Sequence, residues 1–327
     1  MDNCRWGIIG PGKISTKFAD TVQYLEGSTL QAVASRDRQK AENFGGRFGA
    51  KKIYGSYLDL AKDPEVDAVY IGTPHSFHAE QAILCLDHGK AVLCEKPMAL
   101  SASQVKRMIA ASQKNNRFLM EAMWTRFLPA TLQAEAWIKS GAIGELKYIR
   151  ADFGFGAPFQ PESRLYNMHL GGGALLDIGI YPLFLVLFLL GKPSSVNASA
   201  QLAPTGADQS CQAIFNFEDG KIATISCTLS CETSTSAEIA GTAGMIHIPT
   251  RWYRSHYLSL HPKDKEPLHM HLPHEHNGFE YQARELIRCV QHGLIESPMM
   301  SHSFSLQMAE TMDEIRKQCG VHYPDEN

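Results

Sequence analysis

The chain has 327 residues, and at about 150 residues per domain this length predicts about two domains. It carries 31 Lys and Arg against 34 Asp and Glu, a formal net charge of −3, so no basic excess points to nucleic acid or to a membrane as a partner. Apolar residues at 44% and charged residues at 20% match ordinary globular proteins and exclude disordered and fibrous classes.

The first 121 residues alternate short β-branched runs with longer amphipathic stretches. Strands are predicted at residues 5–9, 30–34, 52–54, 68–71, 91–94 and 118–120, and helices at 14–24, 38–48, 57–61, 77–88 and 102–115. Such alternation is typical of right-handed βαβ units. Residues 1–121 are therefore predicted to form a Rossmann domain, a doubly wound parallel sheet that binds a dinucleotide.

The pattern changes in residues 122–327, which are predicted to form a substrate-binding α/β domain. Helices are predicted at 129–139, from the glycines at 171–173 to 190, at 279–292 and at 303–318; strands are predicted at 146–153, 196–202, 211–217, 222–229, 237–241 and 245–248. Consecutive strands joined by short turns indicate an open, mostly antiparallel sheet. The most apolar run, 183–190, is far shorter than the roughly 20 residues of a spanning helix, so it predicts a buried helix in a soluble protein.

A glycine motif lies where the first strand turns into the first helix. Gly10 allows a tight turn, and Gly12 lets the backbone approach a pyrophosphate at the helix N-terminus formed by Lys13 and Ile14. Ser15 takes the third position of the G-x-G-x-x-G/A pattern and is small enough for close helix packing. In this βαβ context the motif predicts dinucleotide binding rather than a purely structural turn.

The end of the second strand indicates which dinucleotide is bound. Ser35 stands where NAD-binding proteins usually carry an acidic residue, and Arg36 and Arg38 offer guanidinium groups to a 2′-phosphate. Asp37 can either cap the next helix or accept a ribose hydroxyl. The sequence favours NADP over NAD.

Polar residues follow three later strands, at the sheet edge where ligands of such folds collect. They are Thr73, Pro74, His75 and His78 after the fourth strand, Glu95, Lys96 and Pro97 after the fifth, and Trp124 and Arg126 after the sixth. In the second domain, Asp177 and Tyr181 are four residues apart, so on a helix they share one side.

These motifs, in this order, make the chain similar to the glucose–fructose oxidoreductase / inositol dehydrogenase / MocA family. Within it, the chain most resembles the dimeric dihydrodiol dehydrogenases and the NADP-dependent D-xylose dehydrogenases. Glu95-Lys96-Pro97 is the most specific of the matches, and Tyr181 stands where many members carry His. The resemblance implies a homodimer formed through the C-terminal sheet and a hydride transfer centred on Lys96.

The expected mechanism follows from that resemblance. Tyr181 takes the proton of a substrate hydroxyl as hydride leaves for the nicotinamide, and Lys96 orients the hydroxyl. A free phenol has a pKa near 10, and a neighbouring ammonium favours the phenolate. Asp177 is expected to hold Lys96 or the sugar hydroxyls, and either His75 or His78 is the alternative base.

An aromatic wall is expected around the substrate, formed by Phe153, Phe155, Trp252 and Phe279, although Phe279 can equally be helix core. Flat aromatic faces suit a cyclic diol or a pyranose. Trp124 and Arg126 are expected to close over the cofactor; the alternative is that they only pack and pair within the fold.

The histidines near the C-terminal end and the cysteines are two further groups of residues that could carry chemistry. His269, His271, His274 and His276 could bind a metal, but no adjoining Cys and no clear set of carboxylates completes a site, so no metal is predicted. Pro267 and Pro273 bracket the segment, which is therefore predicted to be a loop. The eight cysteines contain no C-x-x-C pair, and with no leader at the N-terminus they predict free thiols in the cytoplasm.

The resulting prediction is an NADP-dependent oxidoreductase acting on a secondary alcohol of a small sugar or a trans-dihydrodiol. Three alternatives remain open: a reductase working from ketone to alcohol, a glycoside hydrolase that uses transient oxidation by NAD, and a non-catalytic sensor of nucleotide or sugar. Relatives of the last kind tend to lose catalytic residues, whereas Lys96 and Tyr181 are both present here.

Overall fold

Two compact units divide the chain, of which the computed structural model describes residues 3–324. The first unit runs up to Trp124 and includes Glu275–Leu306; the second comprises Thr125–His274 and the chain from Gln307 onward. The division predicted after residue 121 placed all of residues 122–327 in the second domain, whereas residues 275–306 belong to the first unit. The chain returns because helix α8 (Glu280–Gln291), which buries Leu286 and Cys289, packs on helix α1 (Lys13–Tyr24) of the first unit.

The sheet of the first unit has six strands in the order β3-β2-β1-β4-β5-β6. Its strands are β1 (Cys4–Ile9), β2 (Ser28–Ala34), β3 (Lys52–Tyr54), β4 (Ala68–Ile71), β5 (Ala91–Glu95) and β6 (Leu119–Ala122). All neighbouring pairs are parallel, and β4 and β5 are buried at every position, as expected for strands covered on both faces. The predicted Rossmann fold is confirmed.

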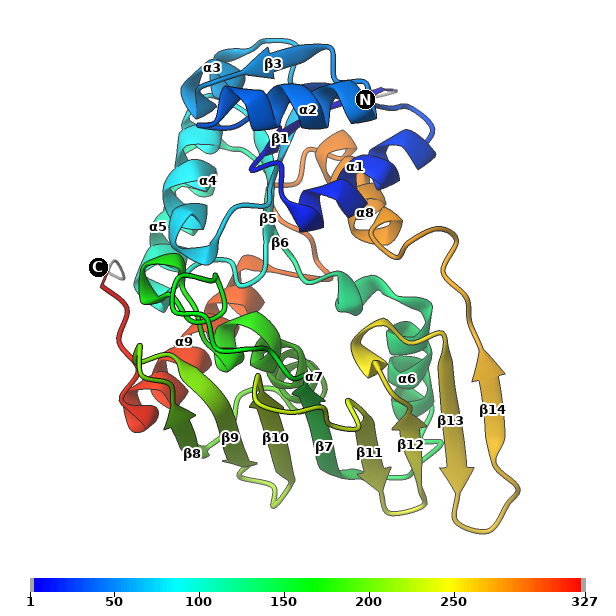
Figure 1. Ribbon diagram of the computed structural model, residues 1–327. Helices are drawn as coiled ribbons and strands as arrows, with labels where there is room; N and C mark the ends of the chain where they lie inside the picture. The colour runs from blue at the N-terminus through cyan, green and yellow to red at the C-terminus, as the bar shows by residue number, and fades with distance from the viewer. Residues whose placement is uncertain (1–2, 325–327) are drawn as a thin grey trace. The chain divides into compact units, whose positions relative to one another are not determined.

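Helices cover both faces of this sheet: α4 (His78–Asp87) and α5 (Ala102–Asn115) on one, α1 and α8 on the other (Figure 1). The remaining helices are α2 (Arg38–Phe48) and the short α3 (Tyr57–Lys62). Local sequence explains where several begin. Asp37, Ser56 and Ser101 each accept a hydrogen bond from a first-turn amide of the helix that follows.

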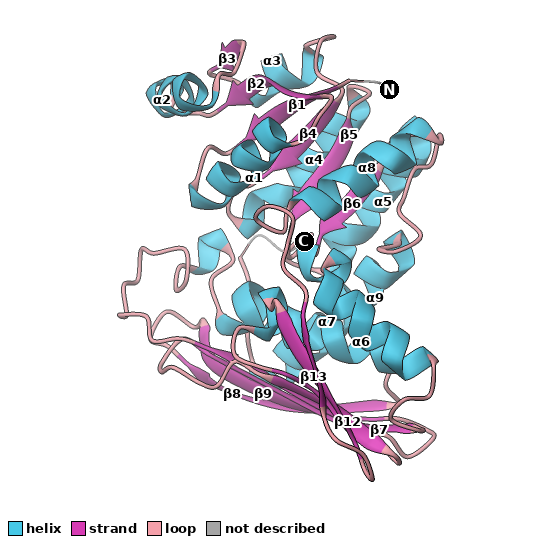
Figure 2. Ribbon diagram, turned by 90° about the vertical axis from the view of Figure 1, so that its right-hand side faces the viewer, coloured by secondary structure: helices cyan, strands magenta, loops and turns pink. Residues whose placement is uncertain are grey.

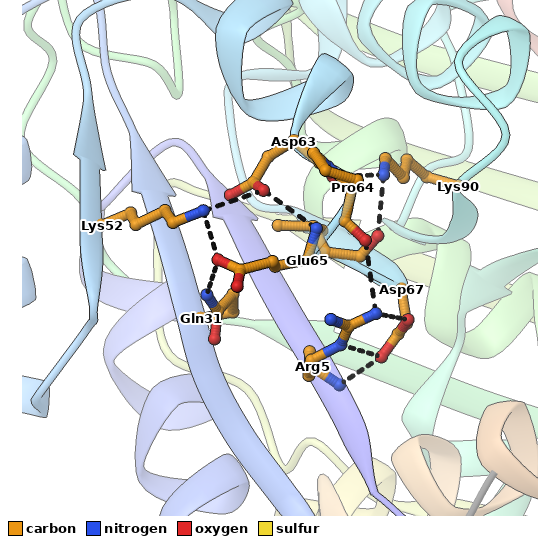
Figure 3. A network of polar contacts seen from close by, with 9 residues as sticks. Arg5, Gln31, Lys52, Asp63, Pro64, Glu65, Asp67 and Lys90 are labelled. Atoms are coloured by element: carbon orange, nitrogen blue, oxygen red, sulfur yellow. Dashed lines mark hydrogen bonds and ion pairs between the residues drawn. The ribbon is translucent and has the colours of Figure 1, made fainter.

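A polar network ties together the loops before β4 and β5 (Figure 3). Arg5 forms an ion pair with Asp67 at 2.7 Å, and Lys52 one with Asp63 at 3.1 Å. Lys90 is buried, and its Nζ donates to the carbonyl oxygens of Asp63 (2.5 Å) and Val66 (2.8 Å). Burial lowers the pKa of Lys90. The network lies away from the polar strand ends and serves the fold.

The second unit contains an eight-stranded sheet in the order β14-β13-β12-β11-β7-β10-β9-β8. Its strands are β7 (Leu146–Gly154), β8 (Ser195–Leu202), β9 (Asp208–Asn216), β10 (Ile222–Thr228), β11 (Ala237–Gly241), β12 (Gly244–Ile248), β13 (Tyr257–Pro262) and β14 (Leu268–His271). Only β7 and β10 pair in parallel; the other pairs are antiparallel. The predicted mostly antiparallel sheet is confirmed.

The last two strands were not predicted from the sequence. Residues 267–273 were predicted to be a loop because prolines bracket them, and this is wrong for β14. Both prolines lie outside the strand, so neither removes a hydrogen bond that pairs Leu268 and His271 with β13.

Helices α6 (Pro129–Lys139) and α7 (Ile180–Leu190) cover one face of this sheet (Figure 2), and α9 (His302–Cys319) ends the fold. The stretch Met168–Leu190 is long and apolar enough to cross a membrane, yet 83% of its most apolar part is buried inside the protein. It is the core of the second unit. The predicted single helix from the glycines to residue 190 is instead interrupted, since Leu175–Gly179 forms one turn of π-helix before α7 begins.

Candidate active site

The glycine turn after β1 has the geometry that a pyrophosphate needs. Gly10 has φ +82°, and a Cβ there would lie 2.5 Å from Thr73 Cγ2, so only glycine fits. A Cβ at Gly12 would meet nothing closer than 3.9 Å, and no side chain caps α1. Ser15 is buried and donates to the Gly10 carbonyl at 2.6 Å. The open, uncapped helix end beginning at Lys13 and Ile14 therefore fits the diphosphate of a dinucleotide.

The residues after β2 divide into helix-capping and exposed groups. Asp37 accepts a hydrogen bond from the amide of Lys40 at 3.2 Å, and Ser35 accepts one from the amide of Asp37, also at 3.2 Å. Of the two roles left open for Asp37, the structure shows the helix cap. Arg36 is exposed, with its guanidinium 4.9 Å from the Phe77 ring centroid, whereas Arg38 pairs with Glu42 at 3.0 Å. Arg36 is therefore better placed than Arg38 to bind a phosphate near the end of β2.

The turn after β4 holds its two histidines inside the protein. His78 is fully buried, and its ring nitrogens lie 2.8 Å from the Pro97 carbonyl and 2.9 Å from the Thr73 carbonyl. Burial lowers the pKa of His78. His75 is buried beside it, with ring centroids 5.8 Å apart. His78 thus ties the Thr73-Pro74 turn to the turn after β5 and is not free to act as the alternative base.

Two buried carboxyl groups accompany Lys96. Glu95 accepts hydrogen bonds from Tyr70 Oη at 2.5 Å and from the Lys96 amide at 3.3 Å. Glu121, on β6, accepts one from the Met98 amide at 2.9 Å. Burial raises the pKa of both carboxyl groups, while the nearby charge of Lys96 lowers it. The three charged groups form one electrostatic cluster at the end of β5.

Trp124 and Phe279 pack on each other within the first unit, with ring centroids 4.9 Å apart. Both are almost fully buried, and Lys17 lies 5.8 Å from the Trp124 ring centroid. Phe279 directly precedes α8, so of the two roles considered for it the structure shows helix packing in the Rossmann unit. Arg126, in the second unit, pairs with Glu135 at 3.3 Å and stacks on Phe188 at 4.2 Å. Its guanidinium is thus engaged by packing and pairing.

The π-turn carries the acid and the phenol of the second unit. Pro182 would clash in a continuous α-helix, but α7 begins only two residues before it, at Ile180. Asp177 lies in the π-turn and Tyr181 in the first turn of α7, both buried. Single π-turns frequently mark functional sites.

Arg164 is the partner of Asp177 within this unit. Its Nη1 donates to Asp177 Oδ1 at 2.8 Å, and the charges of Asp177 and, more weakly, Tyr181 raise the pKa of Arg164. Sequence reasoning did not find Arg164, which was expected to be loop. The one available indication was an arginine within the Gly- and Pro-rich loop that leads into the glycines at 171–173.

The aromatic residues of the second unit form a cluster around Tyr181. Phe153 stacks on Tyr253 at a centroid distance of 4.3 Å, and Tyr181 lies 5.7 Å from Phe153 and 5.0 Å from Tyr253. Phe155 is partly exposed and 6.4 Å from Phe153. Trp252 is buried, and its Nε1 donates to the Asp152 carbonyl at 2.9 Å. The neighbouring Tyr253, which the sequence analysis missed, therefore contacts the phenol where Trp252 was expected.

The four histidines do not form one group. His269 and His271 lie on β14, and His274 packs on His256 at 4.1 Å. His276 belongs to the first unit, where its Nε2 lies 2.6 Å from Asp20. Across residues 3–324, no cluster of three or more His, Cys, Asp or Glu side chains is arranged to hold a metal ion.

Comparison with known proteins decides the family. Residues 4–123 match the oxidoreductase family with an NAD-binding Rossmann fold, and residues 131–247 match the GFO/IDH/MocA C-terminal domain. The chain belongs to the GFO/IDH/MocA family. It is an enzyme of the dehydrogenase and oxidoreductase class, with an NAD(P)-binding Rossmann fold.

Several relatives in this family match over the whole chain. Trans-1,2-dihydrobenzene-1,2-diol dehydrogenase of Danio rerio is 40% identical over 99% of both chains, and that of Mus musculus is 36% identical over 98% of both. Among solved structures, an aldose-aldose oxidoreductase from Caulobacter crescentus is 26% identical with a TM-score of 0.89, covering 97% of this chain and 98% of its own. A 3-ketoreductase from Actinomadura kijaniata in complex with NADP is also 26% identical, with a TM-score of 0.86 and the same coverage.

Proposed function

We propose that this GFO/IDH/MocA protein is an NADP-dependent oxidoreductase that transfers a hydride between nicotinamide and a secondary alcohol of a trans-dihydrodiol or of a D-xylose-like sugar. The observation that carries the proposal is the 40% identity to the Danio rerio dihydrodiol dehydrogenase over 99% of both chains. The aromatic cluster of Phe153, Tyr181 and Tyr253 supports it, because flat apolar faces suit a cyclic diol or one face of a pyranose.

The first unit would bind the nucleotide. The amides at the start of α1 would hold the diphosphate, and Arg36 would pair with the 2′-phosphate, since a guanidinium binds phosphate strongly. Because position 35 is a serine and not an acidic residue, no carboxylate there would repel that phosphate. The Asp37 carboxylate caps helix α2. We propose the turns containing Thr73, Pro74, His75 and His78, with Glu95, Lys96 and Trp124, as the rest of the cofactor site. Bound NADP would supply the hydride acceptor.

Lys96 and Tyr181 would carry out the transfer of the substrate hydroxyl proton. Tyr181 would accept the substrate hydroxyl proton during oxidation and return it during reduction, and the Lys96 ammonium would stabilise the phenolate. Asp177 would orient the phenol or the substrate hydroxyls through its pairing with Arg164. Arg126 already pairs with Glu135, so its part in cofactor binding would be indirect.

The oligomeric state and the cellular location of the enzyme are also proposals. The open sheet exposes Leu202, Ile214 and Ile222, and such apolar exposure supports a homodimer formed through the C-terminal sheet. The eight free cysteines support a cytoplasmic location, because reducing compartments keep thiols reduced.

The test is a spectrophotometric assay of NADP and NAD reduction with trans-dihydrodiols, D-xylose and D-glucose, run also in reverse with the matching ketones and lactones. Reduction of NADP by a diol or a sugar, with at least tenfold lower kcat/KM for Lys96→Met and for Tyr181→Phe, would support the proposal. Lys114→Met on the exposed end of α5 is the matched control. No turnover with any substrate in either direction would refute it.

A further inference from the structure

The loop that joins β10 to β11, residues 229–236, is tied to β7 by the side chain of Asp152. The carboxylate of Asp152 accepts three hydrogen bonds from consecutive residues of this loop: from the Ser234 hydroxyl at 2.9 Å, the Thr235 amide at 2.8 Å and the Ser236 amide at 3.0 Å. The Thr233 hydroxyl is a further donor to the same carboxyl group. The Asp152 amide in turn donates to the Ser236 carbonyl at 3.1 Å. One residue of β7 thus fixes the end of the loop.

Thr235, at the centre of these contacts, has a backbone conformation that threonine rarely adopts. Its φ is +46°, in the left-handed region, where a β-branched side chain is strained. It is buried, and its hydroxyl donates to the Gly154 carbonyl at 3.4 Å. Gly154 leaves room for the loop, because a Cβ there would lie 2.5 Å from Thr233 Cγ2. A strained conformation persists only where the surrounding contacts enforce it, and the Asp152 carboxylate supplies such contacts.

The same loop and the same aspartate hold Trp252, the residue that precedes Tyr253. The Thr235 carbonyl accepts the Trp252 amide at 3.2 Å, and the Asp152 carbonyl accepts the indole Nε1 at 2.9 Å. Arg251, directly before Trp252, also lies in the left-handed region, with φ +60°. Trp252 is therefore tied through its backbone to the loop and through its side chain to β7.

Tyr253 and Phe153 connect this anchored region to the aromatic cluster. Their rings stack with 17° between the ring planes, and the Tyr253 carbonyl accepts the Thr125 hydroxyl at 2.7 Å. Phe153 directly follows Asp152 on β7, so the two side chains point to opposite faces of the sheet. Both rings of the stack are thus attached to Asp152, Phe153 through the chain and Tyr253 through Trp252.

We propose that Asp152 is a positioning residue for the alcohol substrate: it holds the Tyr253 ring on Phe153 as one flat apolar face. It does so by enforcing the conformation of the loop and by anchoring Trp252. The inference rests on the proposed function, in which this face binds the ring of the substrate. Asp152 points away from Phe153 and acts through Tyr253, so its loss should weaken substrate binding and leave proton and hydride transfer in place.

The first test is the steady-state kinetics of Asp152→Asn with the alcohol that the wild type oxidises. Asn keeps the volume, but one of its two polar groups is a donor, so either the Thr235 or the Ser236 amide loses its acceptor. KM for the alcohol should rise about tenfold, while kcat and KM for NADP change less than about twofold. Asp63→Asn, which alters the acceptor of the Glu65 amide in the first unit, is the matched control and should keep the KM for the alcohol. A wild-type KM in Asp152→Asn would overturn the proposal.

A double variant shows whether Asp152 acts through Tyr253. If it does, Asp152→Asn should raise KM less than about twofold further in the Tyr253→Ala protein, whereas two independent effects would multiply to about 100-fold. A full product of the two effects would contradict the proposal. Should Asp152→Asn not fold, Ser234→Ala removes one donor to the carboxylate and should raise KM about twofold in the wild type alone. An equal rise in the Tyr253→Ala protein would contradict it in the same way.

The final test needs no turnover, so it separates this inference from the proposed function. Fluorine NMR spectra of the protein containing fluorotyrosine report the surroundings of each tyrosine ring, and the Tyr253 signal is the one that Tyr253→Phe removes. Asp152→Asn should shift this signal towards that of Tyr257, which is 55% exposed, whereas Asp63→Asn should leave it in place. An unmoved signal would refute the inference even if the protein proves to be a dehydrogenase. A shifted signal in a protein that oxidises no alcohol and reduces no ketone would refute the proposed function alone.

Discussion

Arg164 Nη1 donates to Asp177 Oδ1 over 2.8 Å, and the two residues belong to a loop and to the π-turn that precedes Tyr181. An acid on an apolar helix needs a partner, and this guanidinium supplies one within the same unit. Asp177 therefore forms an ion pair with a residue of its own unit. Arg164 also interacts electrostatically with the Tyr181 phenol of the same unit.

Arg164→Gln should therefore lower activity more than stability. Loss of the guanidinium removes this ion pair from the Asp177 carboxylate and lets the π-turn shift, and a displacement of about 1 Å near reacting groups can cost about 100-fold in rate. We expect kcat/KM to fall about 10- to 100-fold with a Tm change below about 3 °C. Arg150→Gln, which removes the exposed pair with Glu238, should leave both unchanged. A variant with normal kcat/KM would exclude Arg164 from the site.

Tyr253→Ala should raise the KM for the alcohol substrate. Its ring stacks on Phe153 at 4.3 Å and lies beside Tyr181, so its removal opens the aromatic cluster. An aromatic contact is worth about 0.5–1.5 kcal/mol beyond its buried area, and we expect KM to rise about tenfold. Steady-state kinetics of Tyr257→Ala, a tyrosine that is 55% exposed on β13, give the comparison. Equal KM values for the two variants would argue against a substrate-facing cluster.

Arg36→Gln should weaken NADP specifically. A charge-assisted hydrogen bond to phosphate is worth about 1.5–3 kcal/mol, which corresponds to tenfold or more in KM for NADP, whereas NAD lacks the 2′-phosphate. Kinetics with both nucleotides measure the difference, and Arg107→Gln on α5 serves as the control. If KM for NAD rises as much as KM for NADP, Arg36 binds adenine or ribose and not the phosphate.

Asp208→Asn should flatten the pH dependence of stability. Asp208 is buried, accepts the Leu175 amide at 2.7 Å, and burial raises its pKa from the ordinary 3.8 to about 7. Between these values the folded state binds more protons than the unfolded state, so the free energy of unfolding falls as pH rises from about 4 to 7. The loss attributable to this group is up to about 4 kcal/mol. Urea unfolding across this range should show the decline in the wild type and in the exposed control Asp264→Asn, but less of it in Asp208→Asn. An identical slope in all three proteins would contradict the assignment.

Ile214→Lys should separate the proposed dimer. Ile214 is 48% exposed on β9, and a buried lysine in an interface is costly. Sedimentation should show a protein of about half the wild-type mass with unchanged circular dichroism. Leu132→Lys, at a leucine of α6 that is 38% exposed, should leave the mass unchanged. A wild-type protein that sediments as a monomer would dismiss the dimer.

Local chemistry explains why much of the first unit could be predicted. Gly10 must be glycine because its φ is +82°, and Asp37 caps α2 through its own side chain. Both features depend on residues that are adjacent in the sequence, so the sequence predicts them. The second unit was harder. Strand β14 is an edge strand with histidines on it, and only its pairing with β13 makes it a strand. Pro182 indicated a disturbed helix, but the chain alone did not show that a π-turn would precede it.

By itself, the sequence determined the family, the Rossmann unit, the open antiparallel sheet and the positions of Lys96, Asp177 and Tyr181, because each depends on periodicity or on a motif of adjacent residues. The tertiary structure alone decided which groups share an environment. It placed Arg164 on Asp177, Tyr253 on Phe153 and Glu121 on the Met98 amide, and it placed Phe279 in the packing of the first unit. These partners come from separate strands, helices and loops, and burial, which sets the charge of a carboxyl such as Glu121, exists only once the chain has folded.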